Sequence, residues 1–228
     1  MRPERMQLVT PARRLVAEGV GTALLVAAVI GSGIMAQRLA VDPAVALLCN
    51  TVATGGALVA ILLVFGPLSG AHLNPVVTVV MAATKDLTPQ LAAGYIVAQI
   101  LGAIAGAVLA NAMFGLPAIT WSEHVRAGHA QLLSEGVATF GLLAVVIAVG
   151  RTRPSIAPIA VAAFIVGAYW FTASTSFANP AVTVGRAFSD TYAGIRPADV
   201  GGFIVAQACG AAASGVLFTW LVPLHPSV

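Results

Sequence analysis

The sequence predicts an all-α membrane protein in which six transmembrane helices and two half-length, re-entrant helices form an inverted repeat. Three observations predict this fold. Apolar residues make up 59% of the 228 residues and charged residues only 8%, which is too little polar surface to cover a water-soluble globule of this size. Apolar stretches of membrane-spanning length recur along the chain, and the two halves of the sequence repeat each other.

The six spans follow from the thickness of a bilayer. A hydrocarbon core about 30 Å thick needs about 20 apolar residues in helical form. Two further apolar segments, residues 74–84 and 179–189, are about half that length and cannot cross alone. The apolar windows of full length are residues 15–36, 45–65, 90–113, 132–150, 155–174 and 200–222.

The internal repeat gives the second half its orientation. Three pairs of segments match in the same order: EGVGT at 18–22 with EGVAT at 135–139, LNPVVTV at 73–79 with ANPAVTV at 178–184, and GYIVAQ at 94–99 with GFIVAQ at 202–207. Each half contains three full spans, an odd number, so the second half enters the membrane with opposite orientation. The two short segments therefore enter from opposite faces.

Basic residues predict the topology. If the N-terminus is inside, four Arg residues lie on the outer side, Arg38, Arg126, Arg186 and Arg196, and the other seven basic residues are cytoplasmic. This bias predicts cytoplasmic N- and C-termini in a multi-pass membrane protein. The same charges are read as loop charges, so no nucleic-acid partner is expected. The seven cytoplasmic residues are Arg2, Arg5, Arg13, Arg14, Lys85, Arg151 and Arg153.

An Asn-Pro pair opens each short segment. Asn caps an exposed amide, and Pro suits the first helical position, so helices are expected to begin at Asn74 and Asn179. Each helix start carries roughly half a positive charge, and two starts meeting at the midplane would repel cations. Irregular backbone at membrane depth is tolerated where it lines a cavity, so the loops 69–73 and 175–178 should line a pore. Asn amides would donate to a solute oxygen there, and loop carbonyls would accept.

These features resemble the aquaporin, or major intrinsic protein, superfamily over nearly the whole chain. The resemblance rests on paired Asn-Pro-Ala-type boxes within a six-span inverted repeat. It implies one aquaporin-like channel domain over residues 1–228, with repeats of about 12–115 and 130–224, and a homotetramer with one pore per subunit. Val for Ala in the first box is expected to adjust packing only. The boxes read Asn74-Pro75-Val76 and Asn179-Pro180-Ala181.

Glu18 and Glu135 are the acids that lie deep within spans. Such residues are costly in lipid unless they face the interior with partners. The resemblance implies that they hold the re-entrant loops by accepting from loop amides, with help from Gln99 and Gln207, and we favour this over a proton relay. His72, just before the first box, has two interpretations: a lining residue of the cytoplasmic half of the pore, or a brace for the loop.

The expected selectivity filter departs from the family pattern. In most relatives an arginine follows the second box and faces an aromatic residue of the second span, whereas these positions are Val182 and Thr54 here. Losing a guanidinium removes a fixed charge and five donors, so the constriction should be wider and less selective for water.

Two other filter positions follow from counting. Ser176 is assigned from the second box. The fifth-span residue is Gly167 by the same count or Tyr169 by counting from Pro158, because the loop before the second box is about two residues shorter than usual.

Arg186 has two interpretations. It lies four residues after Val182 and could reach the outer mouth of the pore, or it could cap the outer end of the short helix beside Asp190. We favour the cap.

The Thr54 and Val182 pair is similar to that of the aquaglyceroporin-like channels associated with bacterial arsenic-resistance operons, which conduct trivalent arsenic hydroxide and some organoarsenicals. The resemblance implies passive flow of small neutral solutes such as glycerol-like polyols, arsenite and water. The alternatives are a water-selective aquaporin and an inverted-repeat secondary transporter. No nucleophile with a base partner and no metal-ligand spacing is present, so we expect neither an enzyme nor a cofactor or metal.

Overall fold

A computed structural model describes residues 9–84 and 87–223. The N-terminal Arg2 and Arg5, Lys85 and the two chain ends lie outside the described residues. The described residues are helical or in loops and form no strand. The elements are α2 (Pro11–Leu39), α3 (Pro43–Ser69), α4 (Pro75–Ala83), α5 (Pro89–Met113), α6 (His129–Thr152), the short 3₁₀ helix η1 (Pro154–Ile156), α7 (Ala157–Phe171), α8 (Pro180–Arg186) and α9 (Pro197–Leu221).

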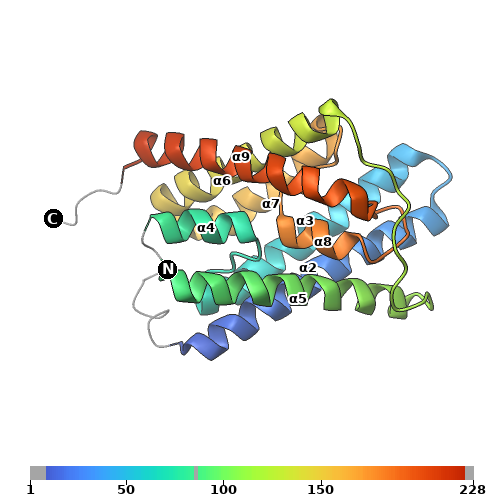
Figure 1. Cartoon of the computed structure of the whole chain (residues 1–228), viewed down its shortest axis with the longest axis horizontal. Helices are drawn as coiled ribbons and strands as arrows, with labels where there is room; N and C mark the ends of the chain where they lie inside the picture. The colour runs from blue at the N-terminus through green and yellow to red at the C-terminus, as the bar shows by residue number, and fades with distance from the viewer. Residues whose placement is uncertain (1–8, 85–86, 224–228) are drawn as a thin grey trace.

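The predicted fold class is confirmed. Within the described residues, six helices are long and apolar enough to cross a membrane. The two short helices begin near the middle of the bundle, and α4 extends towards one end while α8 extends towards the other (Figure 1). The start of α2 and the end of α9 lie at the same end of the bundle, on the left of Figure 1.

Helix starts follow the Pro residues closely. Pro occupies the first turn of α2, α3, α4, α5, α8 and α9, where its missing N–H costs nothing. Several helices extend beyond the predicted windows. For example, α2 begins at Pro11, four residues before the predicted start at residue 15. The fifth span ends at Phe171 instead of residue 174, and α8 ends at Arg186 instead of residue 189. The residues that precede a helix and accept from its backbone are Thr10, Asp42, Asn74, Thr88 and Asn179.

The two halves are built around matching helix crossings. Helix α2 packs mainly against α5 and α3, and α6 packs mainly against α9. A Cβ at Gly102 would overlap the carbonyl of Gly19, and a Cβ at Gly210 would overlap the carbonyl of Gly136. Only glycine permits this backbone approach, which is the usual basis of close packing between membrane helices.

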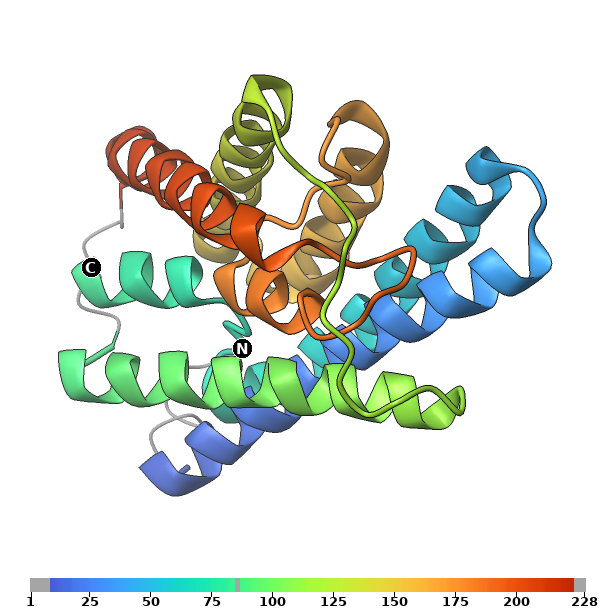
Figure 2. The same cartoon turned by 45° about the vertical axis from the view of Figure 1, so that its right-hand side comes forward.

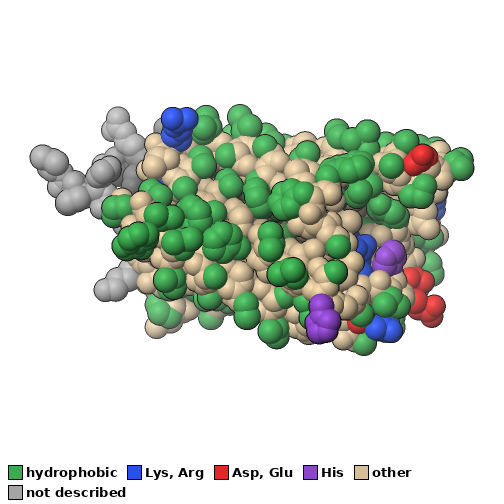
Figure 3. All heavy atoms as spheres, turned by 90° about the horizontal axis from the view of Figure 1, so that it is seen from above, with side chains coloured by type: hydrophobic (Ala, Val, Ile, Leu, Met, Phe, Trp, Pro, Cys, Tyr) green, Lys and Arg blue, Asp and Glu red, His purple; other side chains and the backbone are tan. Residues whose placement is uncertain are grey.

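The outer surface of the bundle is apolar along its length. In the space-filling view, hydrophobic side chains cover the middle of the molecule and most charged side chains lie near its ends (Figure 3). Exposed Leu and Val side chains on α2, α3 and α5 contribute to this surface. The arrangement is that of an integral membrane protein, because lipid tails accept apolar side chains and exclude charged ones.

One long loop covers one end of the bundle. Residues 114–128 run from α5 to α6 across that end (Figure 2). The amides of Thr120 and Ser122 donate to the carbonyls of Phe188 and Ala187, just after α8. The loop is therefore fixed to the segment that contains the second box.

Candidate pore

The two Asn-Pro boxes meet in the centre of the bundle. Asn74 accepts from the Val76 amide through Oδ1 (3.1 Å), and its Nδ2 donates to the carbonyl of Ala178 (2.8 Å). Asn179 reciprocates through its own Nδ2, which donates to the carbonyl of Leu73 (2.7 Å). Each Nδ2 carries two hydrogens, so each Asn amide retains one donor after this exchange.

A cavity of about 340 Å³ passes along the boxes. Both Asn residues line it. We call the part near Gly66, Gly150 and Pro154 its first end, and the part near Phe177 and Arg186 its second end. Most of the lining is apolar and comes from α2, α3, α6 and α7, including Leu25, Val29, Leu58, Leu62, Leu142, Val146, Val161 and Ile165.

The backbone of both re-entrant loops is strained. Among the described residues, those other than glycine that have a positive φ all lie in these two loops. Each such residue costs roughly 1 kcal/mol, so the conformation persists only because surrounding contacts hold it. The residues are Ala71, Leu73, Thr175, Ser176 and Ala178.

The first loop is held by a buried carboxylate. Glu18 is fully buried on α2, and its two oxygens accept four hydrogen bonds. The donors are the Ser69 hydroxyl (2.6 Å), the amides of His72 (2.9 Å) and Leu73 (2.7 Å), and Gln99 Nε2 (2.8 Å). We call this arrangement the first carboxylate clamp.

The second loop is held in the same way. Glu135 is fully buried on α6 and also accepts four hydrogen bonds, which form the second carboxylate clamp. The donors are the Ser174 hydroxyl (2.6 Å), the amides of Phe177 (2.9 Å) and Ala178 (2.9 Å), and Gln207 Nε2 (2.6 Å). The structure therefore brings both acids and both Gln residues to the loops.

His72 lines the cavity, and its side chain contacts helices α4 and α5. Its Nδ1 lies 3.2 Å from the Thr78 hydroxyl, and its ring packs edge-on against Tyr95 at a centroid distance of 5.3 Å. Its place in the lining of the cavity agrees with the first interpretation of this residue. Behind it, the Tyr95 hydroxyl donates to the Ser69 carbonyl (2.7 Å) and accepts from Arg14 Nε (2.8 Å).

Most of the expected filter positions line the cavity. Thr54, Ser176 and Val182 line it and are almost fully buried. Tyr169 also lines the cavity, with its hydroxyl 3.5 Å from Thr54 Oγ1. Gly167 is exposed and does not line the cavity, so the count that gave Gly167 is corrected. The short loop before the second box displaced that count, whereas Pro158 lies on the same helix as Tyr169.

Arg186 lines the cavity and does not pair with Asp190. Its Nε donates to the Ala193 carbonyl, and its Cζ lies 3.3 Å from the centroid of the Phe177 ring. Asp190 instead accepts from the Glu123 amide (2.9 Å). Arg186 ends α8 as expected, but the part of the preferred interpretation that placed it beside Asp190 is corrected, because Arg186 lies buried at the second end.

Arg126 was not among the expected site residues. It enters from the loop 114–128, is 8% exposed, and its Nε donates to the Gly194 carbonyl (2.8 Å). Its guanidinium also contacts the Ser174 carbonyl (3.3 Å) and lies 4.9 Å from the Phe177 ring centroid. Burial lowers the pKa of Arg126 to about 10, which leaves it charged at neutral pH. Nothing in the sequence of this loop repeats or matches a motif, so no signal marked the residue.

Paired half-helices whose starts meet within a six-helix bundle, beside one lined cavity, define a membrane channel. The model of the major intrinsic protein family matches residues 5–176. The chain is 52% identical over 217 residues to aquaglyceroporin AqpS of Rhizobium meliloti (strain 1021), covering 95% of this chain and 93% of that protein. The chain belongs to the major intrinsic protein family, and it is a passive solute channel rather than an enzyme.

More distant proteins agree with this assignment. The probable aquaporin TIP2-2 of Oryza sativa subsp. japonica is 34% identical over 184 residues, covering 75% of this chain and 73% of that protein. The X-ray structure of the aquaglyceroporin from Plasmodium falciparum has a TM-score of 0.74, with 19% identity and coverage of 94% of this chain and 98% of that chain. At that identity the likeness shows the fold alone.

Proposed function

We propose that the channel conducts small uncharged hydroxylated solutes bulkier than water. Glycerol-like polyols and arsenite or organoarsenicals are the candidate solutes. The single observation that carries this proposal is the second end of the cavity, where Val182 stands directly after the second box and lines the cavity together with Thr54. The relative from Rhizobium meliloti bears the name aquaglyceroporin, which favours a polyol over water alone.

The central boxes suit a neutral solute. Asn74 and Asn179 each retain one amide hydrogen for a solute oxygen after bonding to the opposite loop. The two helix starts add positive potential at the same place, which opposes cations. A hydroxyl can accept from an Asn amide and donate to a loop carbonyl, whereas a cation finds no carboxylate oxygen free in the two clamps.

The mostly apolar wall restricts where a solute forms hydrogen bonds. Away from the boxes, Leu and Val side chains dominate the lining. A polyol can place its carbon backbone against this wall while its hydroxyls follow the polar positions. Val182 supplies neither a charge nor a donor, so we expect it to leave room for a carbon-bearing solute.

Orientation and assembly complete the proposal. The positive-inside bias favours an orientation with the first end of the cavity at the cytoplasm and the second end outside, and the bacterial relative supports a plasma membrane location. The exposed apolar faces of the helices suit lipid and a homotetramer with one pore per subunit, as the family resemblance implies.

Solute uptake into proteoliposomes tests the proposal. Wild-type protein is expected to speed glycerol uptake in stopped-flow light scattering relative to protein-free vesicles. Val182→Arg should lower glycerol permeability about tenfold or more while retaining water permeability, because it adds bulk and five donors at the constriction. Val182→Leu is the matched control, since it adds bulk without charge.

Two results would favour the alternatives. Water permeation without glycerol or arsenite permeation would indicate a water-selective aquaporin. Flux that saturates and depends on a proton or sodium gradient would indicate a secondary transporter.

A further inference from the structure

The second end of the cavity contains a charged side chain with unused donors. Arg186 is 2% exposed and lines the cavity. Within residues 9–84 and 87–223, its one hydrogen bond runs from Nε to the Ala193 carbonyl, and it has no carboxylate partner. A guanidinium has five N–H donors, so the four on the two Nη atoms remain for whatever occupies the cavity.

Two hydroxyl groups lie at the same end. Ser176 lines the cavity, is 2% exposed, and its hydroxyl has no hydrogen-bond partner in the described part of the chain. Tyr169 lines the cavity as well, with its hydroxyl 3.5 Å from Thr54. Buried polar groups are normally paired, so the unpaired Ser176 hydroxyl, together with the unused donors of Arg186, points to a solute with oxygen atoms.

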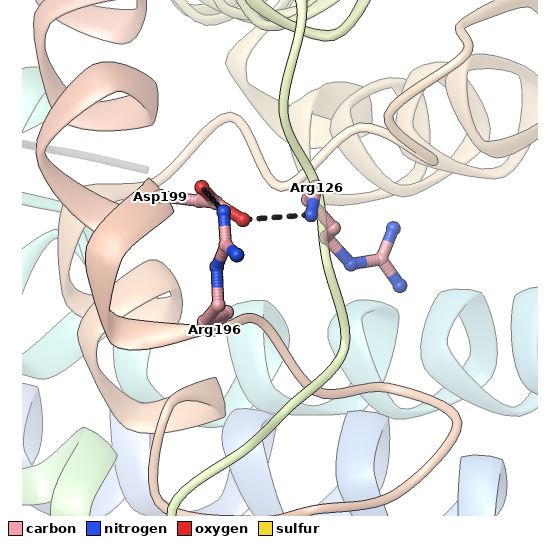
Figure 4. Close-up of polar contacts among 3 residues, drawn as sticks. All are labelled: Arg126, Arg196 and Asp199. Carbon is pink, nitrogen blue, oxygen red and sulfur yellow. Dashed lines mark hydrogen bonds and ion pairs between the residues drawn. The ribbon is translucent and has the colours of Figure 1, made fainter.

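Arg126, the other buried arginine near Phe177, uses its guanidinium to bind backbone carbonyls instead of a solute. Its guanidinium donates to the carbonyls of Gly194, Ser174 and Tyr192. Its backbone amide donates to Asp199 (2.9 Å), which also pairs with Arg196 (2.8 Å). Figure 4 shows the Arg126 guanidinium pointing away from Asp199, so that carboxylate anchors the loop backbone and leaves the guanidinium charge unpaired.

The stack on Phe177 fixes the available guanidinium. The two Arg side chains approach the Phe177 ring at 3.3 Å for Arg186 and 4.9 Å for Arg126, measured from Cζ to the ring centroid. The Arg186 plane is also held at Nε by Ala193. A guanidinium restrained in this way can receive solute oxygens with little further loss of side-chain freedom.

We propose that Arg186 is a specificity-determining residue, whose Nη groups bind solute oxygens one helical turn beyond Val182 and favour solutes with several oxygens over water. The inference rests on the proposed function, because it assumes that such solutes pass through this cavity. Most relatives have an arginine at the position of Val182. Here Arg186 would supply that positive charge one turn later on α8, without narrowing the cavity at Val182.

The test compares permeability ratios in proteoliposomes. Arg186→Met keeps an unbranched side chain against Phe177 but removes the charge and all five donors. The ratio of glycerol to water permeability is expected to fall roughly tenfold, the effect of one charge-assisted hydrogen bond, and the ratio of urea to water permeability should fall less. Arg186→Lys should restore part of the glycerol ratio. Arg38→Met is the matched control, because Arg38 also stacks on an aromatic ring and donates to a carbonyl, but is exposed and lies outside the cavity lining.

The permeability ratios distinguish a solute-binding role of Arg186 from a purely structural one. An unchanged ratio, or an equal fall in water and glycerol permeability, would show that Arg186 only supports the loop at Ala193 and would overturn the inference. If Arg186→Met does not reconstitute, Arg186→Gln, which retains two neutral donors, gives the ratio. Wild-type vesicles that pass water but neither glycerol nor urea would refute the proposed function itself.

Discussion

The two re-entrant loops are held by the same clamp but braced by different side chains. In the first half the Tyr95 hydroxyl donates to the Ser69 carbonyl, next to the clamp. In the second half the equivalent aromatic is Phe203, which has no hydroxyl, and Arg126 donates to the equivalent Ser174 carbonyl instead. The repeat thus conserves the groups that position each box and varies the groups around it.

The residue two positions before each box differs in the same sense. His72 places an imidazole beside Tyr95 at the first end, whereas Phe177 places an apolar ring beneath two guanidiniums at the second end. Two guanidiniums are thus gathered over Phe177 at the second end. The midplane boxes therefore depend on duplicated parts, whereas the difference between the two ends comes from a few unmatched side chains.

Removing a clamp carboxylate should have the largest effect. Glu18→Ala and Glu135→Ala each remove the acceptor of four hydrogen bonds, so each is expected to lower the free energy of unfolding by about 4 kcal/mol or more. Unfolding by titration with a denaturing detergent measures both, with the exposed Glu123→Ala as the control. A loss in only one of the two variants would contradict the equivalence of the clamps.

Substitution of the glycine at either helix crossing should lower the unfolding free energy by a similar amount, and by less than the loss of a clamp carboxylate. Gly102→Ala and Gly210→Ala each push a methyl group into a backbone carbonyl, which should cost about 2 kcal/mol of unfolding free energy. The control is Gly56→Ala in α3, where a Cβ meets nothing within 4 Å and the variant should be neutral or slightly stabilising. The same titration compares them. A cost at Gly102 without one at Gly210 would show that the two crossings are not equivalent in strength.

The features that could be predicted from the sequence are those that occur in both halves of the repeat. The positions of Glu18 and Asn74 were predictable because their partners recur in the second half with the same chemistry. Arg126 was not, because it lies in a connecting loop and acts through carbonyls, which any sequence provides. The choice between Gly167 and Tyr169 depended on a loop length, which places residues in space only once the chain is folded.

The mildest expected change tests the brace of the first loop. Tyr95→Phe gives the first half the same ring that Phe203 provides in the second, but without a counterpart of Arg126. The Ser69 carbonyl, in a fully buried residue, then loses its phenolic donor, and Arg14 Nε loses its acceptor.

We expect Tyr95→Phe to lower the unfolding free energy by about 1 kcal/mol, while glycerol permeability changes little because the Glu18 clamp still holds the loop. The detergent titration and vesicle uptake measure the two quantities on one preparation. An unchanged unfolding free energy would show that the ring alone suffices in both halves. In that case the hydrogen bond from Arg126 to the Ser174 carbonyl would not be needed to replace the hydroxyl that Phe203 lacks. The role of the Arg126 side chain would then be its contact with the Phe177 ring.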